Sequence, residues 1–226
     1  MKKTLLLFLF LIPLILFGQE DTDAKTLDAN KGSSYITFSV SPFLLVVSPR
    51  WNFGYIKSID EKIKLGVTVG IGSSRIVFDN YDASFSNYFI WEIRPEVYII
   101  HNPKSKVSIY NSVELFYINE NAVVKNSYYI TENDFNVYFK QADYNRQKYG
   151  AVANFGVFVP FSSYFGMNFY AGLGIKWRQN TYTNLVQAEP YPNDYDDFLW
   201  RSYYRKEGLK IGFQPNFGVN LNLIIQ

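Results

Sequence analysis

Hydrophobic and polar residues alternate with a period of two along most of the chain after Tyr35. The segment 164–178 shows this best, since Phe165, Met167, Phe169, Ala171, Leu173, Ile175 and Trp177 share one face. Such alternation, rich in β-branched and aromatic residues, is typical of β-strands. The pattern predicts eight strands, at residues 35–47, 49–57, 62–72, 88–100, 105–118, 146–160, 164–178 and 207–225.

The connections between these strands alternate in length. The short ones are 58–61, 101–104 and 161–163, and the long ones are 73–87, 119–145 and 179–206. The first hairpin, near Ser48, is also tight. Short turns at one end and long loops at the other are typical of an outer-membrane barrel, with both termini on the short-turn, periplasmic side.

Two features indicate which face of the strands is inside. The polar face carries most of the 14 glycines: Gly54, Gly66, Gly70, Gly72, Gly150, Gly156, Gly166, Gly172, Gly174, Gly212 and Gly218. Glycine weakens a solvated strand but makes room inside a narrow barrel. The apolar face carries aromatic residues near the strand ends, as the girdles of membrane barrels do. We therefore expect an all-β fold, an eight-stranded antiparallel up-and-down transmembrane β-barrel, closed because an open edge is costly in hydrocarbon.

The N-terminus has the features of an export signal. Lys2 and Lys3 precede an apolar run from Leu5 to Phe17, which is too short for a membrane-spanning helix and contains Pro13. We expect a signal peptide at 1–18, a flexible tail at 19–34 and the barrel domain at 35–226. The expected location is the outer membrane, and the expected partners are its lipid and the barrel-assembly machinery.

Three segments carry a family resemblance: Phe17-Gly18-Gln19, Ile93-Arg94-Pro95-Glu96-Val97-Tyr98 and Gly172-Leu173-Gly174-Ile175-Lys176. With them, the chain over about 35–226 resembles the small eight-stranded outer-membrane barrels of the OmpA/OmpX-like type, including short Bacteroidetes barrels of uncharacterised function. The resemblance implies the architecture rather than an activity. The chain ends in Leu-Ile-Ile-Gln instead of the terminal Phe common in proteobacterial barrels.

Composition and charge exclude several classes of function. The chain has no Cys, which excludes disulfide scaffolds, thiol catalysis and Cys-based zinc sites. Without Lys2 and Lys3 the 22 basic residues fall to 20 and equal the 20 acidic ones, so charge gives no indication of a nucleic-acid partner.

The polar face of the predicted strands also carries charges. We predict a structural ion-pair network in the lumen, formed by Arg50, Lys64, Glu92, Arg94, Glu96, Glu114, Lys176 and Arg178, with Lys148 and Lys210 on the same face. The interpretation we favour is a plug of ion pairs, because buried charges need partners and eight strands enclose little space. The alternative is a binding or transport pathway for a small or hydrophobic solute, in which Arg50→Ala or Glu96→Ala changes uptake.

The long loops offer candidate binding residues. Tyr191, Asp194, Tyr195, Asp196 and Asp197 lie in the last loop, where an extracellular ligand could bind. Calcium prefers such oxygen ligands, yet the EF-hand spacing is absent, so we predict no metal and no cofactor. The long loops are rich in Tyr, which suits binding because Tyr gives contact area at low entropy cost. The alternative is that the strands extend beyond the membrane and that these tyrosines pack against their flanks.

The sequence favours a protein that is not an enzyme and that uses its loops for surface interaction or anchoring. A lipid-modifying barrel enzyme is one alternative, with Asp194, Asp196 or Ser202 at the rim. The only histidine, His101, lies at the opposite, short-turn end. A second alternative is a soluble periplasmic barrel with its apolar face inside. The oligomeric state does not follow from the sequence.

Overall fold

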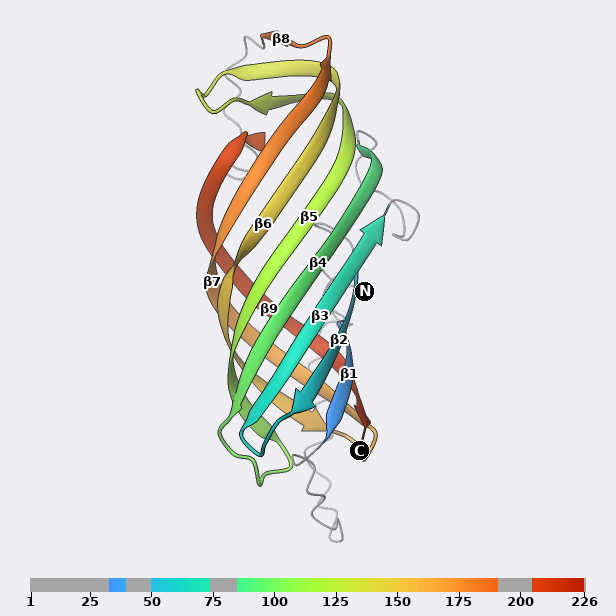
Figure 1. Cartoon of the computed structure of the whole chain (residues 1–226), viewed down its shortest axis with the longest axis vertical. Coiled ribbons are helices and arrows are strands. Elements are labelled where there is room, and N and C mark those ends of the chain that lie inside the picture. Colours follow the sequence, from blue (N-terminus) through green and yellow to red (C-terminus); the bar gives the residue numbers. More distant parts are fainter. Residues whose placement is uncertain (1–32, 40–49, 74–84, 191–204, 226) are drawn as a thin grey trace, which may run out of the picture.

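The computed structural model describes residues 33–39, 50–73, 85–190 and 205–225, and Figure 1 shows that they form one long, twisted barrel. Its strands are β1 (Ser34–Ser39), β2 (Trp51–Ser58), β3 (Ile63–Ser73), β4 (Phe85–Ile100), β5 (Ser108–Ile130), β6 (Asn136–Pro160), β7 (Phe165–Val186), β8 (Glu189–Pro190) and β9 (Gly208–Ile225).

The sheet closes on itself. Its strand order is β5-β4-β3-β2-β1-β9-β7-β6-β8, and β5 also pairs with β6. The two-residue β8 pairs only with the outer end of β6, at Val137 and Tyr138, so the barrel itself has eight strands. All of its strand pairs are antiparallel. The predicted fold class of a closed, eight-stranded antiparallel barrel is confirmed.

The termini of the barrel meet at the end with the short turns. Ser34 pairs with Ile225 across the β1–β9 seam. The turns at 59–62, 101–107 and 161–164 lie at this same end, which is the lower end in Figure 1. The leader predicted at 1–18 and most of the tail at 19–34 lie outside the described residues. Within the described part of the chain, no helix is long and apolar enough to cross a membrane.

Two of the predicted long loops are wrong. Residues 119–145 continue strands β5 and β6 on both sides of a turn at 131–135, and β7 continues through Val186. The outward face of these segments is polar, with Asn119, Asn121 and Asn145. In the other strands the outward positions are apolar, whereas here several of them carry side-chain amides. The alternation of apolar and polar residues, from which the other strands were predicted, is therefore lost in these segments.

We call this part of the chain the upper extension: residues 118–130 of β5, 136–148 of β6 and 178–186 of β7, with β8. Figure 1 shows it rising past the other strands and curling over at its tip. The tip meets the start of β9, where Ile130 forms an isolated parallel bridge with Lys206. The Glu207 amide also donates to the Ile130 carbonyl, at 2.8 Å. The tip of the extension is thus joined to the segment that leads into β9.

Pro95 shows how a proline is accommodated inside the sheet. The β3–β4 ladder runs through it, pairing Val67 with Pro95. The β4–β5 ladder passes from Ile93–Tyr117 to Glu96–Glu114 and skips Arg94 and Pro95. The hydrogen bond that proline cannot donate is therefore lost only on the β5 side.

Two apolar clusters fill opposite ends of the interior. The lower cluster takes residues from β1, β2, β4, β5, β6 and β9: Tyr35, Ile56, Tyr98, Ile100, Tyr110, Phe158 and Ile224. The upper cluster reaches into the extension and consists of Tyr88, Ile90, Phe116, Ile118, Ala122, Val124, Tyr129, Phe139, Ala142, Tyr144 and Val152. Charged side chains lie between them.

Candidate functional site in the barrel interior

Glu92 is the centre of a buried network of charges in the middle of the barrel. Its side chain is 0% exposed and contacts two guanidinium groups, Arg50 at 2.8 Å and Arg94 at 3.1 Å. Asn52 donates a further hydrogen bond to it at 2.7 Å. The ladder position beside Glu92 is Gly70, where a Cβ atom would lie 2.6 Å from the Glu92 side chain. Glycine at that position therefore makes room for the carboxylate.

Arg94 joins a second carboxylate to this network. Its other terminal nitrogen lies 2.6 Å from Glu114, and its guanidinium stacks 5.4 Å from the Phe116 ring centroid. One buried guanidinium therefore neutralises parts of two carboxylates on neighbouring strands. Charge-assisted pairs of this kind are strong when every member has a partner.

Glu96 lies beside this network but is held by neutral donors. It accepts hydrogen bonds from Ser112 at 2.5 Å, Tyr98 at 2.6 Å and Asn154 at 3.2 Å. Asn216 of β9 in turn donates to Asn154 at 2.9 Å, which extends the chain of hydrogen bonds across the lumen.

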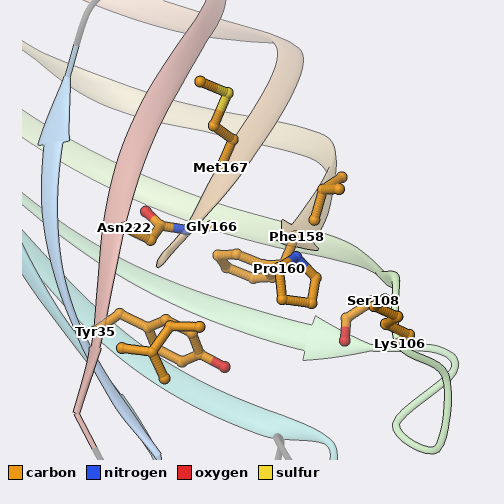
Figure 2. Close-up of a pocket in the computed structure, with 10 residues that line it drawn as sticks. Tyr35, Lys106, Ser108, Phe158, Pro160, Gly166, Met167 and Asn222 are labelled. Carbon is orange, nitrogen blue, oxygen red and sulfur yellow. The ribbon is translucent and has the colours of Figure 1, made fainter. Parts of the chain in front are cut away.

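Lys64 lies at the lower end of the barrel, apart from the carboxylates. Its ammonium donates to the Ser58 hydroxyl at 2.7 Å and to the Tyr35 hydroxyl at 3.1 Å. Figure 2 shows a small pocket at this end, bordered by Tyr35, Phe158 and Pro160, with Lys106 at its edge. The pocket opens beside the lower cluster, in which the Tyr35 ring of β1 stacks on the Phe158 ring of β6 with centroids 5.7 Å apart.

Basic side chains gather in the upper part of the lumen. Arg178, which is 0% exposed, pairs across the ladders with Lys148 on one side and Lys210 on the other. Lys176 lies two positions away on the same face of β7, and Arg146 lies two positions from Lys148. We call Arg146, Lys148, Lys176, Arg178 and Lys210 the basic belt.

One carboxylate lies within the basic belt. Glu120 of β5 pairs with Arg146 of β6 across the ladder, and the two side chains form an ion pair. The Arg146 Nε also donates to Glu120 at 3.1 Å. Sequence reasoning missed both residues because they fell within a predicted loop or at its edge. The sequence did carry a signal for them. Glu120 and Ala122 continue the inward face of β5 at every second residue after Ile118, and Arg146 lies two residues before Lys148 on the inward face of β6.

The structure divides the network that we expected from the sequence. It brings together Arg50, Glu92, Arg94 and Glu114, with Glu96 close by. Lys176 and Arg178 belong to the basic belt instead, and Lys64 lies at the lower end. The predicted loop residues Tyr191, Asp194, Tyr195, Asp196 and Asp197 lie outside the described residues, as does Ser202.

Most aromatic residues expected in the loops lie on the upper extension. Tyr129 stacks on Tyr182 with ring centroids 4.6 Å apart, and Tyr144 lies 5.0 Å from the same ring. Phe139 is fully buried among them. These rings form the core of the extension, as expected of strands that continue beyond the membrane. His101 is an exposed residue of a lower turn.

A polar contact fastens the tip of the extension. Asp134, in the turn between β5 and β6, forms an ion pair with Lys206, and this lysine holds the pKa of the Asp134 carboxyl below its usual range. Burial raises the pKa of the neighbouring Glu207. Arg205 stacks over the Tyr128 ring at 4.1 Å. The segment before β9 therefore holds the tip through side chains as well as backbone.

The outer surface of the barrel is apolar over a band that ends at a row of aromatic residues. On β3 every outward residue of the band is apolar and at least 40% exposed: Ile63, Leu65, Val67, Val69 and Ile71. At the upper edge Trp91 packs against Tyr117, with centroids 5.2 Å apart, and Tyr149 stacks on Trp177 at 5.9 Å.

Amides replace the apolar residues directly above this row. Along the ladders, Tyr117 and Tyr149 are followed by Asn119 and Gln147. Asn145 donates to Asn119 at 3.1 Å and to Asn121 at 2.8 Å. The surface thus changes from apolar to polar within two residues. The expectation that the apolar face points outward is confirmed, and a barrel with that face inside is excluded.

Metal ligands are not gathered anywhere in the described part of the chain. No group of three or more His, Asp or Glu side chains there could hold a metal ion.

Comparisons with known proteins give only distant similarities. No family model matches the chain, and no curated protein matches it. Among solved structures, CarO of Acinetobacter baumannii is similar with 10% identity and a TM-score of 0.43, covering 86% of this chain and 98% of that one. A major outer membrane protein of Thermus thermophilus is similar with 7% identity and a TM-score of 0.41, covering 86% of this chain and 99% of that one. At such low values neither protein indicates the function of this chain.

Proposed function

We propose that the chain is an integral outer-membrane β-barrel protein that crosses the membrane with its lower part and raises the upper extension above it. In this proposal it is not an enzyme, and the extension serves surface interaction or anchoring. A cleaved leader exports it, the assembly machinery inserts it, and both ends of the barrel domain face the periplasm.

The observation that carries this proposal is the outward apolar band with its sharp upper edge. On β7 the band runs from Phe165 to Trp177. At roughly 3.3 Å per residue and a tilt of about 40°, this segment rises about 30 Å, close to the thickness of a hydrocarbon core. Aromatic residues at the edge and amides above it suit the membrane–water interface. In water so much exposed apolar surface would cause association.

The interior supports a structural protein rather than an open pore. The lower cluster brings together side chains from six strands, and the Glu92 network fills the lumen beside β2, β4 and β5 with paired charges. Eight strands leave room for side chains rather than for an aqueous channel. The alternative of a lipid-modifying enzyme depends on rim residues that the structure does not describe, and His101 lies at the other end.

Gel mobility of the detergent-extracted chain, boiled and unboiled, tests the proposal. A closed membrane barrel resists dodecyl sulfate until it is heated, so the two samples should migrate differently. Recovery of the protein from the periplasmic fraction without detergent, with equal mobilities, would refute the membrane assignment.

A matched pair of substitutions locates the membrane on the barrel. Leu173→Lys places a charge in the middle of the apolar band and should destabilise the inserted barrel by about 2–4 kcal/mol. Thr183→Lys places the same charge on the outer face of the same strand, in the upper extension, and should leave stability within about 0.5 kcal/mol. Equal effects in unfolding from lipid vesicles would contradict the proposed boundary.

A further inference from the structure

We propose that one outer face of the upper extension binds the neutral saccharide head groups of lipids in the membrane leaflet around it. The inference rests on the membrane assignment proposed above. The face lies on β5, β6 and β7, which Figure 1 shows rising side by side. We call this face the amide patch, and its members are Asn119, Asn121, Asn145, Gln147, Gln179 and Thr181.

The amide patch lies at the level of the lipid head groups. It forms two rows, in which Gln147 and Asn145 of β6 each pair with a member on β5 and a member on β7. The rows lie two and four residues beyond the row of Tyr117, Tyr149 and Trp177. At roughly 3.3 Å per residue and a tilt of about 40°, they rise about 5 Å and about 10 Å above those rings. A phospholipid head-group layer is about 5–8 Å thick, and sugars make it deeper.

The patch carries no charged group. The nearest charge on the same outer face of β6 is Asp143, which accepts a hydrogen bond from Asn184 at 2.6 Å. On β5 the next charged outward residue is Lys125, four residues beyond Asn121. Phosphate and carboxylate groups are recognised by Lys or Arg, and ammonium groups by carboxylates. A charged head group would therefore find no counter-charge within the patch.

Hydrogen bonds among the amides hold the patch in place. Asn145 donates to Asn119 at 3.1 Å and to Asn121 at 2.8 Å, and Asn121 donates to Asn119 at 3.1 Å. A side-chain amide has two N–H donors and an acceptor oxygen with two lone pairs, so these bonds leave further hydrogen-bonding capacity. Asn121 and Gln179, at opposite corners of the patch, are exposed. A ligand thus meets polar groups whose positions are already fixed, which lowers the entropy cost of binding.

Apolar side chains border the patch. Trp91 and Phe89 of β4 face its β5 members across the ladder, and Leu209 of β9 faces its β7 edge. The rings of Tyr149 and Trp177 lie directly below it. A sugar presents hydroxyl groups at its edges, which both donate and accept as the amides do, and C–H groups on its faces, which contact aromatic rings. Amides within an aromatic and apolar border therefore suit a saccharide.

The position of the patch indicates a saccharide that is carried by a lipid. The patch is part of the outer face of a sheet, so a ligand contacts it from one side only, and few contacts form with each sugar. A lipid held in the surrounding leaflet has a high effective concentration at this level, so few contacts suffice. A free sugar lacks this advantage and pays the full entropy cost of association.

The test uses the full barrel folded into vesicles whose lipids share one set of acyl chains. The vesicles contain phosphatidylcholine alone, or phosphatidylcholine with a minor fraction of a neutral diglycosyl diacylglycerol or of anionic phosphatidylglycerol. A further sample has the free disaccharide outside phosphatidylcholine vesicles. Wild type is compared with Asn121→Ala/Gln179→Ala and with the control Gln141→Ala, which removes an exposed amide four residues beyond Asn145 on β6. The readout is the temperature at which heat-dependent gel mobility is lost.

The expected response is specific to the glycolipid and to the patch. The glycolipid should raise the wild-type midpoint, whereas phosphatidylglycerol and the free disaccharide at the same concentration should not. The double variant should need about tenfold more glycolipid for the same rise, a factor that corresponds to one or two hydrogen bonds of ordinary net strength. Both of its replaced side chains are exposed, so it should still fold in phosphatidylcholine alone. Gln141→Ala should respond as wild type.

Several outcomes would overturn the inference. They are an equal rise with phosphatidylglycerol or with the free disaccharide, and a double variant that keeps the wild-type response. A midpoint that rises with the density of protein in the vesicles, whether or not glycolipid is present, would mean that the patch pairs two copies of the chain. A barrel that inserts but ignores the glycolipid would refute this inference alone, whereas a barrel that inserts into none of the vesicles would refute the membrane assignment as well.

Discussion

The charges inside this barrel form two groups that differ in how they are neutralised. In the Glu92 network, two carboxylates face two guanidinium groups, and bond distances lie between 2.6 and 3.1 Å. In the basic belt, Lys148, Arg178 and Lys210 stand opposite one another across two ladders, and Glu120 is the carboxylate within the belt.

The difference shows that one barrel can bury charge in two arrangements. The network lies where β2, β4 and β5 supply both signs, so it is complete without any other molecule and serves to fill the lumen. The belt lies where the described parts of β7 and β9 supply only basic side chains, and Glu120 of β5 forms an ion pair with one of its members, Arg146. Removing one charge should therefore lower stability in both groups, and by more where two carboxylates lose the guanidinium that they share.

The largest expected effect is that of Arg94→Met, which leaves Glu92 and Glu114 buried without their shared partner. Breaking a buried pair from one side costs about 3–5 kcal/mol. Unfolding in urea from detergent micelles or vesicles measures the loss. Arg94→Lys keeps the charge but not the fork that reaches two carboxylates, so its loss should be smaller. If Arg94→Met unfolds as wild type does, the network does not stabilise the barrel.

A smaller effect is expected at the carboxylate of the basic belt. Glu120→Gln keeps the shape and part of the hydrogen bonding to Arg146 but removes the negative charge. The free energy of unfolding should fall by about 1–3 kcal/mol, because Arg146 loses its charged partner. Urea unfolding from detergent micelles measures the loss, and a variant as stable as wild type would mean that this ion pair does not stabilise the barrel.

The sequence predicted the architecture well because a closed barrel is specified by period-two alternation and by the spacing of turns. Strands β2, β3, β4 and β9 begin and end within three residues of their expected positions. Where the outward residues are Asn and Gln, as at Asn119 and Asn121, the alternation of apolar and polar residues is absent. The strands of the upper extension were therefore mistaken for loops.

The candidate site was predictable only at the level of faces. Alternation placed Glu92, Arg94 and Lys176 in the lumen, but it carries no information on ladder register. Register places Arg178 between Lys148 and Lys210 in the two ladders. Lys64 illustrates the same limit, since two hydroxyl groups rather than a carboxylate bind it. A one-residue shift between strands would change every such partner.

The smallest expected effect extends the comparison to an exposed ion pair, that of Asp134 and Lys206 at the tip of the extension. The pKa of Asp134 is lowered by Lys206, so its contribution to tip stability is present above the pKa of the unfolded chain. This contribution is lost as pH falls through the lower, folded-state pKa. Exposed pairs are weak, so the tip should loosen while the barrel stays folded.

Glu207 acts in the opposite direction and must be removed from the measurement. Burial raises its pKa, so its contribution is present at low pH and is lost as pH rises. In a Glu207→Gln background, hydrogen-exchange protection at 130–135, corrected for intrinsic rates, should fall on acidification below the ordinary carboxyl range. Adding Lys206→Gln should lower the protection at neutral pH and remove most of its pH dependence. An unchanged pH dependence in that double variant would mean that the backbone contacts of Ile130, rather than the ion pair, hold the tip.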